Sequence, residues 1–429
     1  MIRIYVIVFF IITAIEGQTT SLESIIEQAI EHSYKLKIIK TKKTVYEAKE
    51  EEVSSSYYPT LSMGFNFQYT KGYEDGADDI SNIGDTILSS QTQYESSVSL
   101  KANYLLYDFG ARGSQLDMAE LDKKSVNVEY YKEVQKLKLE LLDLYSKILN
   151  IQRDIELNLE IKKNYEKIYL AKKRLNNAGK IDKVSLASEA IRIVELSTKI
   201  EENRSILEDC IYQVNLYTGS NYKKNTEFTF FSLPTQQVIG YEESIGYKEI
   251  SFQKQKKAKE LEQVNSEFYP SVSLFGKHNW YGAAECSANC ALEDLKKRNY
   301  VVGISVNWVL FNGFQTVSKQ ARVKAELEEL RLQELEEKRE FEKVQYLNIQ
   351  KILSLQNDIQ NYQDNLNIQE EKLKMNQRLR DIKKIDKISE FEDRVEKLQK
   401  ILQLKQSLIS KWSKQKELEI LNENIYKDL

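Results

Sequence analysis

The chain has 429 residues and a formal net charge of −3, from 62 Lys and Arg against 65 Asp and Glu. This balance gives no reason to expect a nucleic-acid partner. Charged residues make up 30% of the chain, with only 3 Pro and 15 Gly, which is typical of long, solvated helices. The 2 histidines, His32 and His278, fall on different elements, and no phosphate-loop or nucleophile-elbow motif is present. We therefore expect no enzymatic activity, no cofactor and no metal site.

The first residues have the pattern of a secretory signal peptide. Arg3 precedes an apolar run over 4–15, and the small residue Gly17 follows it. The run is shorter than the about 20 apolar residues that span a bilayer. We predict a signal peptide over 1–17 and an exported mature chain; the alternative is that the run remains as an N-terminal anchor.

The rest of the chain is a duplication. KIDKVSLASEAI at 180–191 is repeated as KIDKISEFEDRV at 384–395, and the turn YDFGA at 107–111 corresponds to FNGFQ at 311–315. The offset of 204 positions is far above the roughly 20–50 residues of a solenoid repeat. It predicts two halves, each with strands at one end and long helices at the other.

The first half, 18–220, opens with helical periodicity over 21–53, preceded by a capping box from Thr20 to Glu23. Strict alternation of apolar and polar residues then predicts a β-hairpin over 57–108. Its apolar face carries Leu61, Met63, Phe65, Phe67 and Tyr69 on one strand, and Val98, Leu100, Ala102, Tyr104 and Leu106 on the other.

A long helical hairpin over 110–217 completes the first half. Its first helix shows the 3-4 spacing of a coiled-coil seam. The seam consists of Val134, Leu137, Leu141, Leu144, Ile148, Ile151 and Ile155. The turn signal is Asn176-Asn177-Ala178-Gly179, after which a returning helix is expected over 183–217.

The second half, 221–429, repeats the same order: a helix, a β-hairpin over 268–313 and a helical hairpin over 314–425. The apolar face of its last strand carries Val302, Ile304, Val306, Trp308 and Leu310. The seam of its long helix, expected over 315–380, consists of Ile352, Leu355, Ile359, Tyr362 and Leu366.

Two interpretations of the strands remain open. One is a periplasmic structural or adaptor coiled-coil protein with a small soluble sheet. The other is an outer-membrane β-barrel, apolar outside and polar inside, which the export signal and the aromatic residues of the apolar faces favour. Four strands do not close a barrel and open edges do not persist in lipid, so a barrel requires several copies. We predict a mixed α and β membrane protein in which each duplicated chain contributes four strands to the barrel. A long antiparallel coiled-coil α-helical barrel accompanies it.

These motifs resemble the outer membrane efflux protein family, the TolC-like outer-membrane channels, over essentially the whole mature chain. The resemblance is carried by SLESIIEQAIEHSYKLK, YYPTLS, FYPSVS, LLYDFGARG, VLFNGFQT and RLNNAGKIDKVSLASEA. It implies a homotrimer with a twelve-stranded barrel in the outer-membrane lipid and a twelve-helix tunnel in the periplasm. It also implies a passive exit duct for efflux or type I secretion, with a periplasmic adaptor (membrane fusion) protein and an inner-membrane transporter as partners.

The resemblance implies two functional regions at the ends of the helical hairpins. Adaptor docking is expected at the hairpin tips, which include Gly179, Lys180, Asp182, Lys384 and Asp386. A cation-selective periplasmic gate is expected where the family has acidic residues, at Ser389 and Glu392, with Asp386 one turn earlier. Ser389 replaces an acid, so the ring is expected to rest on the other two; the alternative is an ordinary exposed helix face. The second tip also lacks the glycine of the first, and Tyr34 stands where the family often has Pro.

Cys286 and Cys290 flank three residues between the last two strands. In a turn this spacing brings their Cα atoms about 6 Å apart, within disulfide range. Because an exported loop is in an oxidising environment, we predict a disulfide; reduced or metal-binding thiols are the alternative. Cys210, on the returning helix, is expected to be a small core residue.

Overall fold

The computed structural model describes residues 19–71, 81–83, 86–88, 93–229, 238–381 and 387–423, so the predicted signal peptide lies outside it. The chain divides into two compact units. Unit 1 comprises Met1–Lys40, Val128–Lys248 and Glu336–Leu429, and unit 2 comprises Thr41–Asn127 and Glu249–Leu335. Each unit therefore combines segments from both halves of the duplicated sequence. Across the described ranges, no helix is both long and apolar enough to cross a membrane.

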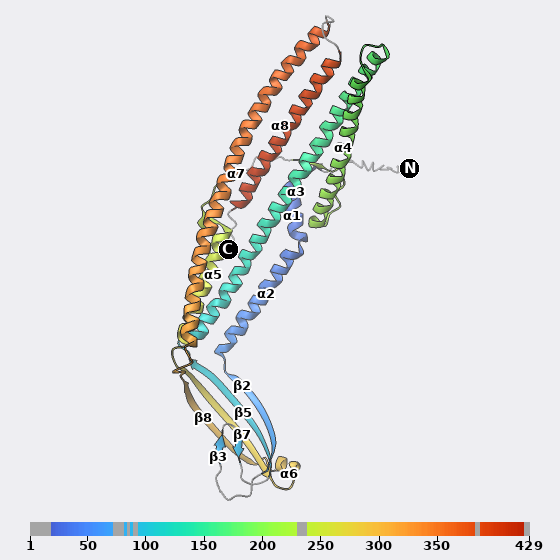
Figure 1. Ribbon diagram of the computed structural model, residues 1–429. Coiled ribbons are helices and arrows are strands. Elements are labelled where there is room, and N and C mark those ends of the chain that lie inside the picture. The colour runs from blue at the N-terminus through green and yellow to red at the C-terminus, as the bar shows by residue number, and fades with distance from the viewer. Residues whose placement is uncertain are drawn as a thin grey trace, which may run out of the picture. The chain divides into compact units, whose positions relative to one another are not determined.

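The long helices follow the predicted boundaries (Figure 1). The first hairpin is α3 (Ala111–Asn177) with α4 (Lys183–Thr218), and the second is α7 (Gln315–Asp381) with α8 (Lys387–Leu421). The two long helices, α3 and α7, both have 67 residues, as the duplication predicts. Their predicted seams are confirmed where burial is greatest: Leu141, Ile148, Ile352, Leu355 and Ile359 are all buried.

The predicted helix over 21–53 is two helices, α1 (Leu22–His32) and α2 (Tyr34–Ser54). The break falls at Ser33, whose ψ of 115° is not helical. Tyr34, the residue at the position where the family often has Pro, therefore begins α2. The predicted capping box is wrong, because Ser21 rather than Thr20 accepts the hydrogen bond from the Ser24 amide (3.3 Å).

The core of unit 1 joins parts of the chain that are distant in sequence. Strands β1 (Thr19–Thr20) and β6 (Glu227–Phe228) pair in parallel. Tyr145 on α3 is fully buried and contacts the rings of Phe228 and Trp412. Its hydroxyl proton is shared between the carbonyls of Thr20 (2.8 Å) and Thr229 (2.5 Å), which both lie within hydrogen-bond distance. Burial raises the pKa of Tyr145, so the hydroxyl remains a donor.

Unit 2 contains an antiparallel sheet of order β2-β5-β7-β8. Its strands are β2 (Thr60–Thr70), β5 (Gln93–Tyr107), β7 (Ser271–Ala284) and β8 (Lys297–Asn307). Both predicted β-hairpins are present, and pairing of β5 with β7 joins them. Strand β8 ends before Trp308 and Leu310, which were predicted to lie in it. Two short strands, β3 (Ser81–Ile83) and β4 (Thr86–Leu88), pair with each other between β2 and β5.

The turns from strand to long helix are duplicated in conformation as well as in sequence. Phe109 and Gly110 have φ of 53° and 90°, and the corresponding Gly313 and Phe314 have φ of 66° and 65°. Such positive φ values favour glycine, and each turn supplies one glycine and one phenylalanine in opposite order. In the first turn, the Asp108 carboxylate accepts hydrogen bonds from the Arg112 amide (3.0 Å) and Nε (2.9 Å).

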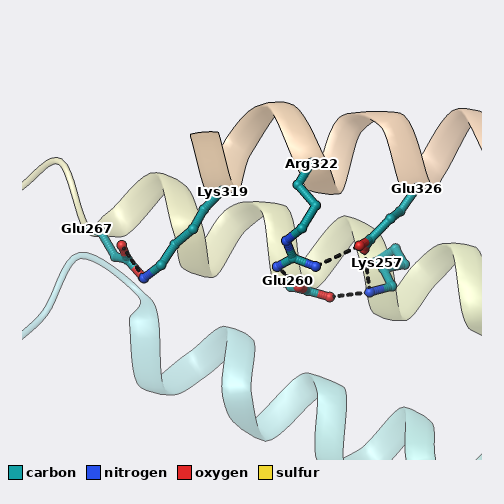
Figure 2. Close-up of polar contacts among 6 residues, drawn as sticks. All are labelled: Lys257, Glu260, Glu267, Lys319, Arg322 and Glu326. Carbon is teal, nitrogen blue, oxygen red and sulfur yellow. Dashed lines mark hydrogen bonds and ion pairs between the residues drawn. The ribbon is translucent and has the colours of Figure 1, made fainter. Parts of the chain in front are cut away.

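Ion pairs join α7 to the preceding helix α5 (Ile245–Ser266) within unit 2 (Figure 2). Lys257 lies 2.7 Å from both Glu260 and Glu326, and Arg322 lies 3.0 Å from Glu260 and 2.6 Å from Glu326. These four residues form a closed ring of alternating charge, here called the α5–α7 charge ring. Hydrogen bonds from Lys257 and Arg322 hold the pKa of Glu326 below its ordinary value.

Candidate functional site

The two faces of the sheet in unit 2 differ in chemistry. Strand register places Met63 opposite Leu100, and Phe65 opposite Val98, on one face. The other face carries Ser62, Asn66, Gln68, Ser97, Ser99, Lys101, Lys277 and Asn279. The apolar face has little cover within one chain, since Met63 is 75% exposed and Ile304 is 66% exposed. An apolar face of this kind has to be covered by lipid or by another protein.

The sheet is open at both edges. Strand β2 pairs only with β5, and β8 pairs only with β7, within the described ranges. The outer edges of β2 and β8 therefore present unpaired backbone N–H and C=O groups. In lipid such groups cost several kcal/mol each, so a membrane-embedded sheet requires further copies to close it.

The tip of the first helical hairpin is exposed and well defined. Gly179 has φ of 70°, and the Lys180 amide donates to the Leu175 carbonyl at 2.9 Å. The Asp182 side chain caps α4 by accepting a hydrogen bond from the Ser185 amide (2.7 Å). Gly179, Lys180 and Asp182 are all exposed. They remain a predicted docking surface.

The tip of the second helical hairpin, between α7 and α8, lies partly outside the described residues. Lys384 and Asp386, predicted for docking and for the gate, lie outside the described residues. Of the other gate residues, Ser389 is half-buried and Glu392 is exposed at the start of α8. Because Asp386 is not among the described residues, the structure does not test the three predicted gate residues as a set, and the gate stays a prediction.

Sequence reasoning missed the buried carboxylates beside the predicted gate. Glu390 and Asp393 are 4% and 6% exposed, and they lie two residues before and one residue after the exposed Glu392. Arg394 lies 2.7 Å from Glu390. Asp393 is the duplication partner of Glu189, which is also buried. A signal was available, because both residues lie inside the repeated KIDK segments.

The segment between β7 and β8 is more structured than a loop. Cys286 and Cys290 are joined as a disulfide, with Cα atoms 6.3 Å apart. Cys290 lies in the short helix α6 (Ala288–Glu293). The Ser96 hydroxyl on β5 donates to the Ala291 carbonyl at 2.6 Å, so α6 packs onto the sheet. Cys210, by contrast, is a buried core thiol whose pKa is raised by that burial.

Residues 25–195 match the family described as Outer membrane efflux protein. The match spans β2, β5, α3 and the tip of the first hairpin, and so includes several of the motifs that carry the resemblance. The resemblance to this family is therefore confirmed over residues 25–195, and the predicted outer-membrane location agrees with it. No curated protein sequence matches the chain.

Solved structures share the fold over nearly the whole chain. CusC matches with a TM-score of 0.73 at 14% identity, covering 95% of this chain and 91% of that chain. VceC from Vibrio cholerae matches with a TM-score of 0.75 at 12% identity, covering 93% of this chain and 94% of that chain. The CmeC outer membrane channel from Campylobacter jejuni has a TM-score of 0.75 at 12% identity, covering 94% of this chain and 86% of that chain. The chain therefore has the fold of these outer-membrane proteins, long helices with a small antiparallel sheet.

Proposed function

We propose that the protein is a passive exit duct of the outer membrane, assembled from three copies of the chain. The observation that carries this proposal is the sheet, which has one apolar face, one polar face and two open edges. Joining β8 of one copy to β2 of the next closes the edges without leaving backbone groups unpaired in lipid. Three copies of four strands then give a twelve-stranded barrel, the number that the family resemblance implies.

The helical hairpins continue the duct into the periplasm in this proposal. Each chain supplies two hairpins, so three copies supply twelve helices to the wall of a tunnel. Export must be driven by a partner, because the residues suggest no site for an energy-yielding reaction. The partners are an inner-membrane transporter and a periplasmic adaptor, as in tripartite efflux or type I secretion.

In this proposal the adaptor docks at the tips of the helical hairpins. The docking residues are Gly179, Lys180 and Asp182 on the first hairpin, and Lys384 and Asp386 on the second. The gate lies at the start of α8. Asp386 and Glu392 supply its carboxylates, and Ser389 stands where the family has an acidic residue. The exposure of Glu392 supports this part of the proposal, because a gate carboxylate has to remain accessible to ions.

Membrane extraction and conductance test the proposal together. The native protein is expected to resist washing at high salt, to need detergent for extraction, and to run as a heat-modifiable trimer. Reconstituted into planar bilayers, it is expected to conduct ions. A chain that washes from membranes at high salt without detergent would instead support the soluble structural or adaptor coiled coil.

A further inference from the structure

Two buried carboxylates occupy corresponding positions in the two helical hairpins. Glu189 on α4 and Asp393 on α8 are 204 positions apart, which is the offset of the sequence duplication. Glu189 is 2% exposed and Asp393 is 6% exposed. The exposed tips and the gate proposed above account for neither residue.

Each carboxylate is paired across its own hairpin. Lys172 Nζ on α3 lies 2.8 Å from Glu189 Oε1, and Lys372 Nζ on α7 lies 2.8 Å from Asp393 Oδ1. The Asn376 amide, at the position that corresponds to Lys172, also donates a hydrogen bond to Asp393. The Lys172–Glu189 and Asn376–Asp393 contacts each span 17 residues. The two halves therefore keep one cross-helix contact, here called the clasp, although the residues that form it have changed.

The clasp lies in a largely apolar seam, where a carboxylate costs free energy unless a cation and hydrogen bonds compensate it. Ile168 and Ile200 are buried in the same hairpin. Glu189 Oε2 is itself buried and has no hydrogen-bond partner among the described residues. Glu189 therefore depends on the cations that reach its other oxygen. A polar residue in an otherwise apolar coiled-coil seam typically specifies the register of the helices at a cost in stability.

The sequence around Lys172 shows why register is at stake. Sliding α4 along α3 by one heptad, about 10 Å, brings Glu189 opposite Tyr165 in one direction and past the end of α3, level with Gly179, in the other; neither residue carries a charge. Arg192 lies 3.3 Å from Glu189, but it is on the same helix and moves with it. Of the two cations that the described residues place beside Glu189, Lys172 is the one on the facing helix, so its pairing distinguishes the native register from the slipped ones.

We propose that Glu189 and Asp393 are positioning residues that fix the register of the two hairpins and thereby the height of their tips. The second hairpin relies on its clasp more heavily, because its turn lacks the glycine that the first has at Gly179. The hydrogen bond to Asp393 raises the pKa of Lys372, so this cation stays charged over a wide pH range. The proposal concerns pairing within one hairpin and does not depend on the exit-duct function.

Distances between spin labels on α3 and α4 test the register directly. The full chain carries labels at Lys163→Cys and Thr198→Cys, both exposed and each nine residues from its clasp residue. The native cysteines are replaced (Cys210→Ala, Cys286→Ser, Cys290→Ser), and labelled chains are diluted with unlabelled chains so that only distances within one chain are measured. The test variant is Lys172→Met with Glu189→Leu, and Glu189→Gln is the milder form. The control is Arg204→Met with Glu201→Leu, an exposed ion pair on α4.

The unmodified clasp is expected to give one narrow distance. The Lys172→Met, Glu189→Leu variant is expected to add a second, longer population, consistent with a displacement of about 10 Å for one heptad. Glu189→Gln is expected to broaden the distribution, and the control is expected to match the unmodified protein. A single native distance in both clasp variants would overturn the proposal, as would loss of helical structure in both, since that would make the clasp a requirement for folding rather than for register.

Discussion

The hydroxyl of Tyr145 donates a hydrogen bond to the Thr20 carbonyl at 2.8 Å and so joins the middle of α3 to the first described residues of the chain. A second bond from the same hydroxyl reaches the Thr229 carbonyl, beyond the end of α4. The single proton of one buried hydroxyl is therefore shared between two carbonyls from segments that are distant in the sequence.

Replacing Tyr145 with Phe removes the hydroxyl, so the carbonyls of Thr20 and Thr229 lose the hydrogen-bond donor that they share. Leaving a buried polar group unsatisfied costs roughly 1–3 kcal/mol, so we expect the Tyr145→Phe variant to unfold at a lower temperature. Thermal unfolding followed by circular dichroism checks this. Tyr212→Phe is the matched control, because Tyr212 is 61% exposed and its variant is expected to match the unmodified protein. Equal unfolding temperatures for Tyr145→Phe and the unmodified protein would show that water replaces the missing donor.

The α5–α7 charge ring predicts an acid-sensitive contribution to stability. The pKa of Glu326 is lowered from 4.5 by Lys257 and Arg322. A carboxylate with a lowered folded-state pKa contributes stability above its unfolded pKa, and this contribution is lost as pH falls through the folded value. We therefore expect Glu326→Gln to destabilise unit 2 near neutral pH and to have little effect well below pH 4.5.

Unfolding is measured between neutral pH and pH 3 by tryptophan fluorescence. Replacing Trp412, in unit 1, with Phe leaves Trp280 and Trp308 of unit 2 as the reporters. Glu201→Gln is the control, since Glu201 pairs with Arg204 on the same exposed turn of α4 and lies outside unit 2. The difference between Glu326→Gln and the unmodified protein is expected to shrink on acidification. A difference that stays constant with pH would assign the effect to packing rather than to the charge of Glu326.

The gate prediction is tested by removing carboxylates at the start of α8. In a threefold assembly, Asp386→Asn with Glu392→Gln removes six negative charges from one constriction. We expect lower cation selectivity in planar bilayers and weaker block by trivalent cations, which need a dense carboxylate cluster. Glu201→Gln again serves as the control. Unchanged conductance, selectivity and block would place Asp386 and Glu392 away from the pore and leave the duct proposal intact.

The disulfide between Cys286 and Cys290 is predicted to be dispensable for export. It closes a short segment around the start of α6, and α6 is also held to the sheet by the Ser96–Ala291 hydrogen bond. Cys286→Ser with Cys290→Ser is therefore expected to export and assemble normally. Mass spectrometry of unreduced peptides is expected to find the native cysteines linked, and free thiols at both positions would reject the bridge.

The sequence predicts the elements with strong periodicity well. The 3-4 spacing from Val134 to Ile155 predicts α3, because apolar residues in a β-strand alternate with a period of two and do not follow this spacing. Alternation from Leu61 to Tyr69 predicts β2 in the same way. The burial of the acidic residues at 384–395 is not predicted by the sequence. Helical periodicity does not distinguish the exposed Glu392 from its buried neighbour Asp393.

The features that the sequence did not predict depend on contacts between distant segments. The β1–β6 pair has two residues in each strand, too few to show a period, and it is bonded to the distant Tyr145. The pairing of β5 with β7 joins the two halves and has no local signal. Ser33 interrupts the first helix without a Pro or Gly, so its non-helical ψ was not visible in the sequence.

Cross-linking between the sheet edges tests the central claim, that three chains close one barrel. Cysteine pairs, one on β2 and one on β8, are introduced at several registers into the full chain without its native cysteines. Within one chain β5 and β7 separate these strands by roughly 14 Å, so no bridge forms inside a chain. We predict that at least one register gives oxidised species of two and three chains, and none larger, on non-reducing gels of membranes. Single chains at every register, or a ladder extending beyond three, would contradict the trimeric duct.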